Sequence, residues 1–219
     1  MQATLRLTAD GSHTLYSSAF DEQYHSIHGA VQESAHIFIQ AALRQCARQE
    51  ISVFEVGFGT GLNAFLSFLE TEKTDKTIHY TAVELFPVPF AQVAELNYAE
   101  LFAQNKKTEF ELLHKCAWNA EMQISDKFSL RKLNISFLEL QQIPNFDVCF
   151  FDAFSPEKQP EMWTAERFAF LYKWANADAI LTTYCAKGAV RRALQEAGFT
   201  VERLQGPKGK REIIRARKC

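Results

Sequence analysis

The sequence predicts an α/β protein built on a mostly parallel β-sheet with helices on both faces. From Ile51 onward, apolar β-branched runs alternate with segments of helical periodicity. Residues 51–65, ISVFEVGFGTGLNAF, change from a strand pattern to a helix pattern across Gly57, Gly59 and Gly61. Residues 146–154, FDVCFFDAF, are almost continuously apolar, which is typical of a strand in the middle of a parallel sheet.

Composition and charge favour one soluble domain. The chain has 219 residues, 47% of them hydrophobic and 23% charged, with a formal net charge of −2. Apolar runs are too short to cross a membrane, and the N-terminal residues MQATLRLTADG lack a charged and apolar leader. We therefore expect a cytoplasmic protein.

Neither a disulfide framework nor a metal site is expected. The five cysteines are odd in number, widely scattered and contain no C-x-x-C pair, and Cys149 and Cys185 lie in apolar runs typical of the core. His25, His28 and His36 have no acidic or cysteine partner at ligand spacing, so polar or structural roles are favoured.

The N-terminal part predicts a hairpin, a loop and a helix. Residues 4–17 alternate around the turn ADGS, which indicates a β-hairpin. Residues 24–32 form a polar, aromatic loop that could fold over a ligand, and a helix should begin at Glu33 or Ser34. We therefore divide one structural domain into 1–32, the N-terminal hairpin and lid loop, and 33–219, the main α/β unit.

The glycine-rich stretch predicts a strand, a tight turn and a helix that together bind a nucleotide or nucleoside. Glycines permit positive φ and close ligand approach, and the start of the following helix offers unpaired N–H groups. A dinucleotide fingerprint is disfavoured because Leu62 stands where the third glycine or alanine is required, and a P-loop is excluded because no Lys-Ser or Lys-Thr follows. A glycine-rich turn without a ligand in another α/β domain remains the alternative.

The next segment predicts a strand and a ribose-binding acid. Residues 78–86, IHYTAVELF, form the second strand, which ends at Glu84, 23 residues after Gly61. An acid at this distance is typical of a carboxylate that accepts two hydrogen bonds from a ribose diol. Pro87 and Pro89 end the strand, and residues 90–102 predict one helix.

The second half of the chain predicts the remaining strands. Residues 112–118 are a short helix candidate, and residues 122–136 indicate two strands joined at SDKF, of which the second is expected to be the third strand of the sheet. After the apolar strand that ends at Asp152 come a helix at 166–175, a strand at 177–185 and a helix at 188–199. Two strands joined by QGPKGK finish a seven-stranded sheet with a C-terminal antiparallel hairpin. The glycines, Glu84 and Asp152 all follow strands, so they should meet at the carboxyl edge of the sheet.

Several motifs resemble known methyltransferases. The acid-x-G-x-G-x-G pattern from Glu55 to Gly61 resembles the first motif of class I S-adenosylmethionine (SAM) methyltransferases, which have a Rossmann-like fold. The strings YHSIHGAVQES, GFGTGLN, DAFSPEKQPEMWT, TYCAKGAVRRALQEAGF and GPKGKRE closely resemble the methyltransferase domain of the MnmC family. The resemblance covers about residues 15–215.

The resemblance implies SAM-dependent N-methylation of tRNA. In this family the aminomethyl group on C5 of a wobble (2-thio)uridine becomes methylaminomethyl. Many bacterial members are fused to an FAD-dependent oxidase that first removes a carboxymethyl group. With 219 residues this chain has no room for that domain, so it resembles a stand-alone methyltransferase whose aminomethyl intermediate comes from a separate enzyme.

The resemblance also implies the roles of individual residues. Asp152 should accept hydrogen bonds from the amine and stabilise its positive charge, and Phe154, Ser155 and Pro156 resemble an aromatic-proline clamp around a flat substrate. Trp163 is assigned either to base stacking or to the core. Asn134 stands where an acid that binds the adenine amine is expected. The residues expected at SAM are Tyr24, Glu55, Gly57, Gly59, Gly61, Asn63, Glu84, Asn134 and Asp152.

The C-terminal segment is basic. Residues 187–219 carry ten Lys/Arg against three acids, a balance of +7, which leaves −9 for residues 1–186. Solvated strand edges would explain this charge as well as contacts with phosphates do. The residues expected at the anticodon stem are Lys187, Arg191, Arg192, Lys208, Lys210 and Arg211.

Other functions remain open. A SAM-dependent methyltransferase of a small-molecule or protein amine would need the same motifs. A polyamine synthase is disfavoured because the glycine loop GFGTG carries no further acids. A catalytically silent SAM-binding or RNA-binding module is disfavoured because Glu55, Glu84 and Asp152 are all present.

Overall fold

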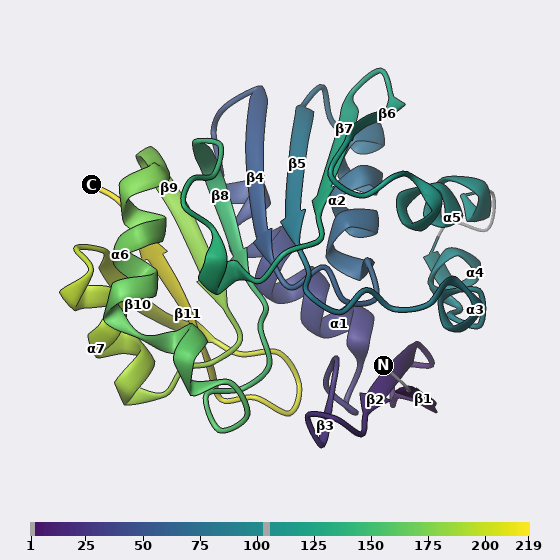
Figure 1. Cartoon of the computed structure of the whole chain (residues 1–219), viewed down its shortest axis with the longest axis horizontal. Coiled ribbons are helices and arrows are strands. Elements are labelled where there is room, and N and C mark those ends of the chain that lie inside the picture. Colours follow the sequence, from purple (N-terminus) through teal and green to yellow (C-terminus); the bar gives the residue numbers. More distant parts are fainter. Residues whose placement is uncertain (1–2, 103–105) are drawn as a thin grey trace.

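The computed structural model describes residues 3–102 and 106–219 and shows one central sheet with helices packed against it (Figure 1). The strands follow the order β10-β11-β9-β8-β4-β5-β7-β6. Five neighbouring strands are parallel: β4 (Glu50–Val56), β5 (Thr77–Val83), β7 (Phe128–Leu133), β8 (Phe146–Phe151) and β9 (Ala175–Thr183). The α/β fold class and the mostly parallel sheet are confirmed.

Antiparallel strands complete both edges of the sheet. The terminal hairpin of β10 (Thr200–Gln205) and β11 (Glu212–Arg217) pairs through β11 with β9, as expected. At the other edge β6 (Glu121–Ser125) pairs with β7. The described sheet therefore has eight strands, one more than expected, because both arms of the hairpin around SDKF belong to it.

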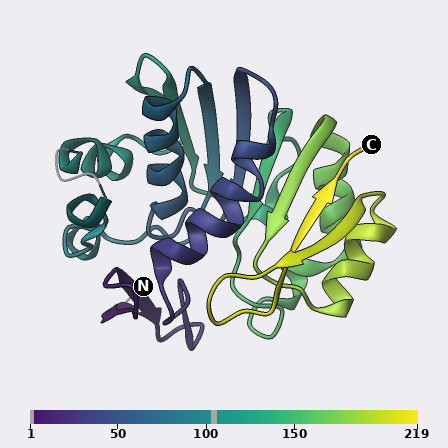
Figure 2. The same ribbon diagram turned by 180° about the vertical axis from the view of Figure 1, so that it is seen from behind.

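Helices lie on both faces of the sheet. One face is covered by α1 (Ala30–Ser34), which continues into the π-helical segment η1 (Ala35–Gln40), by α2 (Leu62–Lys73) and by α5 (Lys107–Lys115). Figure 2 shows α1 and α2 in front of the sheet. The other face is covered by α6 (Ala165–Trp174) and α7 (Gly188–Glu196). Short 3₁₀ turns are Leu43–Gln45, Phe137–Glu139 and Pro160–Trp163.

Alternation along the central strands builds two hydrophobic layers. Phe150 packs with η1, α2 and α5, whereas its neighbour Phe151 packs with α6 and α7, and both are 0% exposed. Burying each such side chain stabilises the fold by about 1.5–3 kcal/mol. On the face of the sheet that carries α6 and α7, the part that these helices leave uncovered is more polar. There His79 forms hydrogen bonds with Ser129 and Glu50.

The N-terminal hairpin is part of the same structure. Strands β1 (Ala3–Leu7), β2 (His13–Ser17) and β3 (Glu22–Gln23) form a small antiparallel sheet. The hairpin turn caps α1, because Asp10 Oδ2 accepts from the Gln32 N–H at 3.0 Å and Ser12 Oγ accepts from the Ala30 N–H at 3.1 Å. The expected start of this helix at Glu33 or Ser34 is therefore wrong, and a boundary after residue 32 falls inside α1.

The single helix expected at 90–102 is also wrong. The chain forms α3 (Phe90–Val93) and α4 (Tyr98–Phe102), which are separated at Asn97. The Asn97 side chain accepts from the His13 N–H at 2.8 Å and donates to the Gly11 carbonyl at 2.9 Å. These bonds fasten the N-terminal hairpin at the break, and local periodicity could not reveal them.

Cys149 and Cys185 are buried and free, as expected for core residues. Within residues 3–102 and 106–219, no helix is long and apolar enough to cross a membrane. The same part of the chain contains no group of histidine, cysteine or acidic side chains that could hold a metal ion.

Candidate functional site

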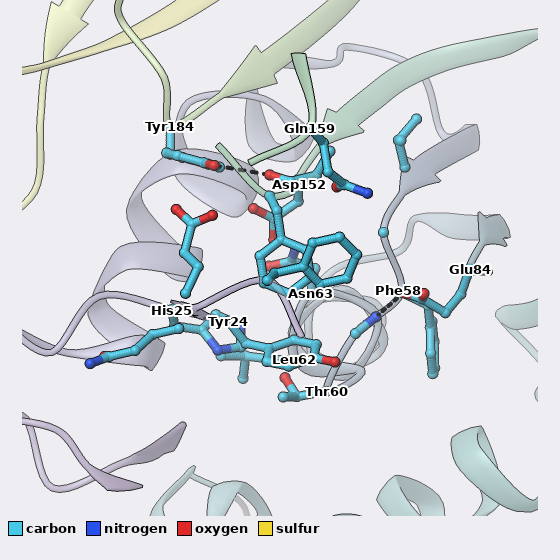
Figure 3. Close-up of a pocket in the computed structure, with 18 of the residues that line it drawn as sticks. Tyr24, His25, Phe58, Thr60, Leu62, Asn63, Glu84, Asp152, Gln159 and Tyr184 are labelled. Atoms are coloured by element: carbon cyan, nitrogen blue, oxygen red, sulfur yellow. Dashed lines mark hydrogen bonds between the residues drawn. The ribbon is translucent and has the colours of Figure 1, made fainter. Parts of the chain in front are cut away.

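A cavity of about 490 Å³ lies over the carboxyl ends of β4, β5 and β8. Its floor comes from the loop after β4 and the start of α2, and one side comes from the N-terminal loop that contains Tyr24 (Figure 3). Residues expected at the cofactor that line it are Tyr24, Gly57, Gly59, Asn63, Glu84 and Asp152. Three separated strand ends thus meet at one cavity.

The glycine loop needs its glycines for two physical reasons. Gly57, Gly59 and Gly61 have φ values of 93°, 50° and 70°, which side chains rarely adopt. A Cβ on Gly57 would also lie 2.6 Å from the Asp152 carbonyl oxygen. Gly57 and Gly59 line the cavity, whereas Gly61 caps α2 and faces His114 behind the loop.

Glu84 is held at the cavity by backbone N–H groups. Its carboxylate accepts from the Gly59 N–H at 3.1 Å and from the Phe86 N–H at 2.8 Å. Burial raises the pKa of Glu84, and these N–H groups oppose the rise. A carboxylate has about four acceptor positions, so two remain for a diol.

Asp152 follows β8 and is held by Asn63 from α2. The Asn63 amide nitrogen donates to Asp152 Oδ2 at 2.9 Å and to Glu55 Oε1 at 3.0 Å. Burial, together with the negative charge of Glu33, raises the pKa of Asp152 to about 7, against the hydrogen bond from Asn63. Glu55 is 0% exposed and does not line the cavity, so it positions Asn63 from behind.

The N-terminal loop packs directly on the loop after β8. The Phe20 ring stacks on the Phe154 ring with centroids 4.4 Å apart, and Tyr24 meets the same ring edge-on at 5.2 Å. Glu22 accepts from both the N–H and the hydroxyl of Ser155, at 2.9 and 3.0 Å. Burial, with the Glu84 charge, raises the pKa of Tyr24 to about 12, so its phenol stays protonated at neutral pH.

Besides Glu55 and Gly61, three residues expected as catalytic or cofactor-binding lie outside the cavity lining. Of the expected clamp only Phe154 lines it, because Ser155 turns toward Glu22 and Pro156 lies beyond. Asn134 is exposed and donates to the Glu84 and Leu85 carbonyl oxygens at 2.9 and 3.2 Å, which ties two loops together. The side chains after β7 that line the cavity are Ile135, Ser136 and Phe137.

Trp163 belongs to the core and not to the cavity lining. It is 6% exposed, and its indole N–H donates to the Phe154 carbonyl at 2.9 Å. Its ring packs edge-on against Phe151 and Tyr184. Trp163 therefore supports the cavity wall from behind.

The basic residues divide into two groups. Lys210 lies inside the cavity, where its ammonium is 3.3 Å from Glu33 Oε1 and 4.7 Å from the Tyr184 ring centroid. Lys187 forms an ion pair with Glu157 at the surface. Among the described residues, no ion pair is formed by the other four, Arg191, Arg192, Lys208 and Arg211.

Sequence reasoning missed several lining residues. Glu33 reaches the cavity from α1, Tyr184 follows β9, and Gln159 and Met162 come from the segment after Asp152. Tyr184 donates its hydroxyl hydrogen to the Ala153 carbonyl at 2.9 Å. All four lie in the strings that carry the family resemblance, which was the signal that could have found them. Periodicity alone could not, because the packing of distant segments brings these side chains together.

Comparison with known proteins shows what this chain is similar to. Residues 92–219 match a family model described as S-adenosyl-L-methionine-dependent methyltransferase. The tRNA 5-methylaminomethyl-2-thiouridine biosynthesis bifunctional protein MnmC of Pseudomonas putida (strain W619) is 33% identical over 217 residues, which cover 91% of this chain and 32% of that protein. The protein of the same description from Azoarcus sp. (strain BH72) is 30% identical, covering 98% of this chain and 35% of that protein. This chain thus spans about a third of the length of these curated relatives.

Solved structures share the fold. The crystal structure of MNMC2 from Aquifex aeolicus superposes with a TM-score of 0.72 at 24% identity and covers 98% of this chain and 70% of that chain. Spermidine synthase from Thermotoga maritima gives a TM-score of 0.59 at 12% identity, covering 100% of this chain and 72% of that chain.

Proposed function

Since this chain belongs to the family of S-adenosyl-L-methionine-dependent methyltransferases, we propose that it methylates the amine of 5-aminomethyl-(2-thio)uridine at the wobble position of tRNA. The product is 5-methylaminomethyl-(2-thio)uridine. The observation that carries the proposal is Asp152, a carboxylate held by Asn63 at the cavity beside the glycine loop. The names of the MnmC relatives contain tRNA 5-methylaminomethyl-2-thiouridine, which is the product of the proposed reaction.

The cavity fits SAM. Glu84 keeps two acceptor positions for the ribose hydroxyls, and Gly57 and Gly59 leave room where side chains would intrude. Leu85 and Ile135 offer apolar surface for the adenine, and the phenol of Tyr24 faces the same space. When bound, SAM supplies an electrophilic methyl group on a positively charged sulfur.

Asp152 prepares the amine. An alkyl ammonium has no lone pair, so the nitrogen must release a proton to water before it accepts a methyl group. In its ionised form Asp152 accepts hydrogen bonds from the nitrogen, orients its lone pair and stabilises the positive charge of the methylated product. Asn63 fixes the orientation of this carboxylate through Oδ2.

Charge in the cavity favours these cationic partners. Among the described lining residues there are four carboxylates, those of Glu22, Glu33, Glu84 and Asp152. The same lining contains a single lysine, Lys210. Such an excess of negative charge attracts both a sulfonium and an amine.

The tRNA is contacted by the exposed basic residues around the C-terminal segment. Arg203, Arg215 and Arg217 are paired with acids of their own hairpin and contribute little charge. The candidates for phosphate contacts are the exposed Arg192, Lys208 and Arg211, the half-buried Arg191, and Lys187, whose partner Glu157 is itself exposed. The wobble base lies in a single-stranded loop, so it can enter a cavity without breaking a base pair.

The nature of the substrate indicates which reaction must come before this one and where in the cell it occurs. The aminomethyl group must be present on the tRNA before this reaction, and the proposed source is a separate enzyme that acts on the same tRNA. The proposed location of the reaction is the cytoplasm.

Methyl transfer from labelled SAM tests this function. The purified chain is incubated with tRNA that carries 5-aminomethyluridine, with tRNA that carries the carboxymethyl precursor and with unmodified tRNA. Label on the aminomethyl tRNA alone is the expected result, and Asp152→Ala should abolish it. Label on a small-molecule or protein amine and on no tRNA would replace the proposed substrate, and no transfer to any acceptor would favour a SAM-binding or RNA-binding module.

A further inference from the structure

Two of the four lining carboxylates already have partners that explain their position. Glu84 is held by the N–H groups of Gly59 and Phe86, and Glu22 by both donors of Ser155. Asp152 faces the reacting nitrogen in the proposed function. Glu33 is the remaining acid, and neither the glycine loop nor the strand ends account for it.

The side chain of Glu33 is held at the cavity by its surroundings. The residue is 8% exposed, and its Oε2 accepts from the Ser26 N–H at 2.8 Å. Asp10 and Ser12 cap α1 from the N-terminal hairpin and so fix the turn that carries Glu33. Removing a carboxylate from water to this extent is unfavourable unless a partner compensates it.

Lys210 is the one lysine among the described lining residues, and it acts on both Glu33 and Asp152. Its ammonium lies 3.3 Å from Glu33 Oε1 and also over the ring of Tyr184. The charges of Glu33 and Lys210 both act on Asp152, in opposite directions. Asp152, Glu33 and Lys210 therefore form one coupled group with a formal charge of −1 when both acids are ionised.

We propose that Glu33 determines amine specificity: together with Asp152 it accepts a substituent that ends in a primary amine and rejects one whose nitrogen also carries a carboxymethyl group. The inference rests on the proposed function. A primary ammonium has three N–H donors and one positive charge, which suit two carboxylates. The carboxylate of a carboxymethyl group on this nitrogen would face the net negative charge of Asp152, Glu33 and Lys210, and neighbouring like charges disfavour binding.

Binding of nucleosides tests the proposal without tRNA and without chemistry. Calorimetry measures the affinity of the full chain, saturated with S-adenosylhomocysteine, for 5-aminomethyluridine and for 5-carboxymethylaminomethyluridine. Wild type should prefer the first. Glu33→Gln keeps the shape of the side chain but removes its charge, so this preference should fall about tenfold to a hundredfold.

Two further variants separate specificity from structure. Lys210→Gln leaves Glu33 uncompensated, so the preference should rise, whereas a purely structural Glu33–Lys210 pair would give both variants the same effect. Glu121→Gln, on the distant edge strand β6, is the matched control and should keep the wild-type preference. Melting temperature and affinity for S-adenosylhomocysteine report whether each variant is folded.

The outcomes are distinguishable from those of the tRNA assay. An unchanged preference in Glu33→Gln overturns the inference, and so does a wild type that binds the two nucleosides equally or binds neither. If wild type methylates tRNA while Glu33→Gln keeps its preference, the inference fails and the proposed function stands. If the nucleoside preference depends on Glu33 but no tRNA is methylated, the inference stands and the proposed function fails.

Discussion

Binding of SAM should expel a proton from Asp152, and this follows from the electrostatics of the cavity. Burial and the charge of Glu33 raise the pKa of Asp152 to about 7 in the free protein. A sulfonium cation near this carboxylate favours the ionised form and lowers the pKa again. S-Adenosylhomocysteine has a neutral sulfur, so it should expel less.

The number of protons released on SAM binding follows from the pKa of Asp152. With a pKa of about 7, about half of the Asp152 side chains carry a proton at pH 7. An opposite charge nearby lowers a carboxyl pKa by about 1 to 3 units, which leaves Asp152 almost fully ionised at this pH. Binding of SAM should therefore release about half a proton at pH 7 and about a tenth at pH 8.

Calorimetry in two buffers with different ionisation enthalpies measures this release. The α-amino group of the ligand also titrates, so the relevant quantity is the difference between wild type and Asp152→Asn with the same ligand. That difference should be about half a proton for SAM at pH 7 and smaller for S-adenosylhomocysteine. Equal release by wild type and Asp152→Asn would refute the placement of the sulfonium beside Asp152.

Three further predictions concern the loop and stability. Glu84→Gln should weaken binding of both SAM and S-adenosylhomocysteine about tenfold to a hundredfold in calorimetry, because the diol loses a charged acceptor, and unchanged affinity would contradict its role. Gly57→Ala should lower the melting temperature and weaken SAM binding more than Gly11→Ala, since both have positive φ but a Cβ on Gly57 would lie 2.6 Å from the Asp152 carbonyl while Gly11 has open space. The folded state holds the Asp152 proton more tightly than the unfolded state, so ionisation costs stability as pH rises from 3.8 to about 7. Asp152→Asn should therefore melt higher than wild type above pH 7 and similarly near pH 4, and a difference independent of pH would contradict this linkage.

The sequence was most informative where local chemistry decides local structure. The three glycines, Glu84 and Asp152 each follow an apolar strand, and parallel strands bring their carboxyl ends to one edge. A site at this edge could therefore be expected from the positions of these residues at the ends of parallel strands. Core roles for Cys149 and Cys185 followed equally from their apolar surroundings.

Long-range contacts explain what the sequence concealed. The start of α1 depends on Asp10 and Ser12 from the hairpin, and the break between α3 and α4 depends on Asn97. Glu33 and Lys210 meet although 177 residues of sequence separate them. Periodicity depends only on residues that are close in the sequence, so it cannot predict contacts between residues that are far apart along the chain.

The paths of the loops explain why some residues expected at the site lie outside the cavity lining. Ser155 and Asn134 lie one or two residues from cavity-lining positions, but their side chains bond Glu22 and the carbonyl groups after β5. A shift of one residue in a loop turns a side chain away from a cavity. Residues at strand ends can be placed more reliably from the sequence, because hydrogen bonds in the sheet fix the position of each strand.

The atom that receives the methyl group distinguishes N-methylation of the wobble nucleoside from methylation of its ring or ribose. The chain is incubated with SAM that carries a deuterated methyl group and with tRNA that carries 5-aminomethyl-2-thiouridine, and the digested nucleosides are fragmented in a mass spectrometer. We predict that the deuterated methyl group is found on the side-chain nitrogen of the wobble nucleoside and is absent when Asp152→Asn replaces wild type. A deuterated methyl group on a ring atom or a ribose oxygen, or undiminished transfer by Asp152→Asn, would contradict the account.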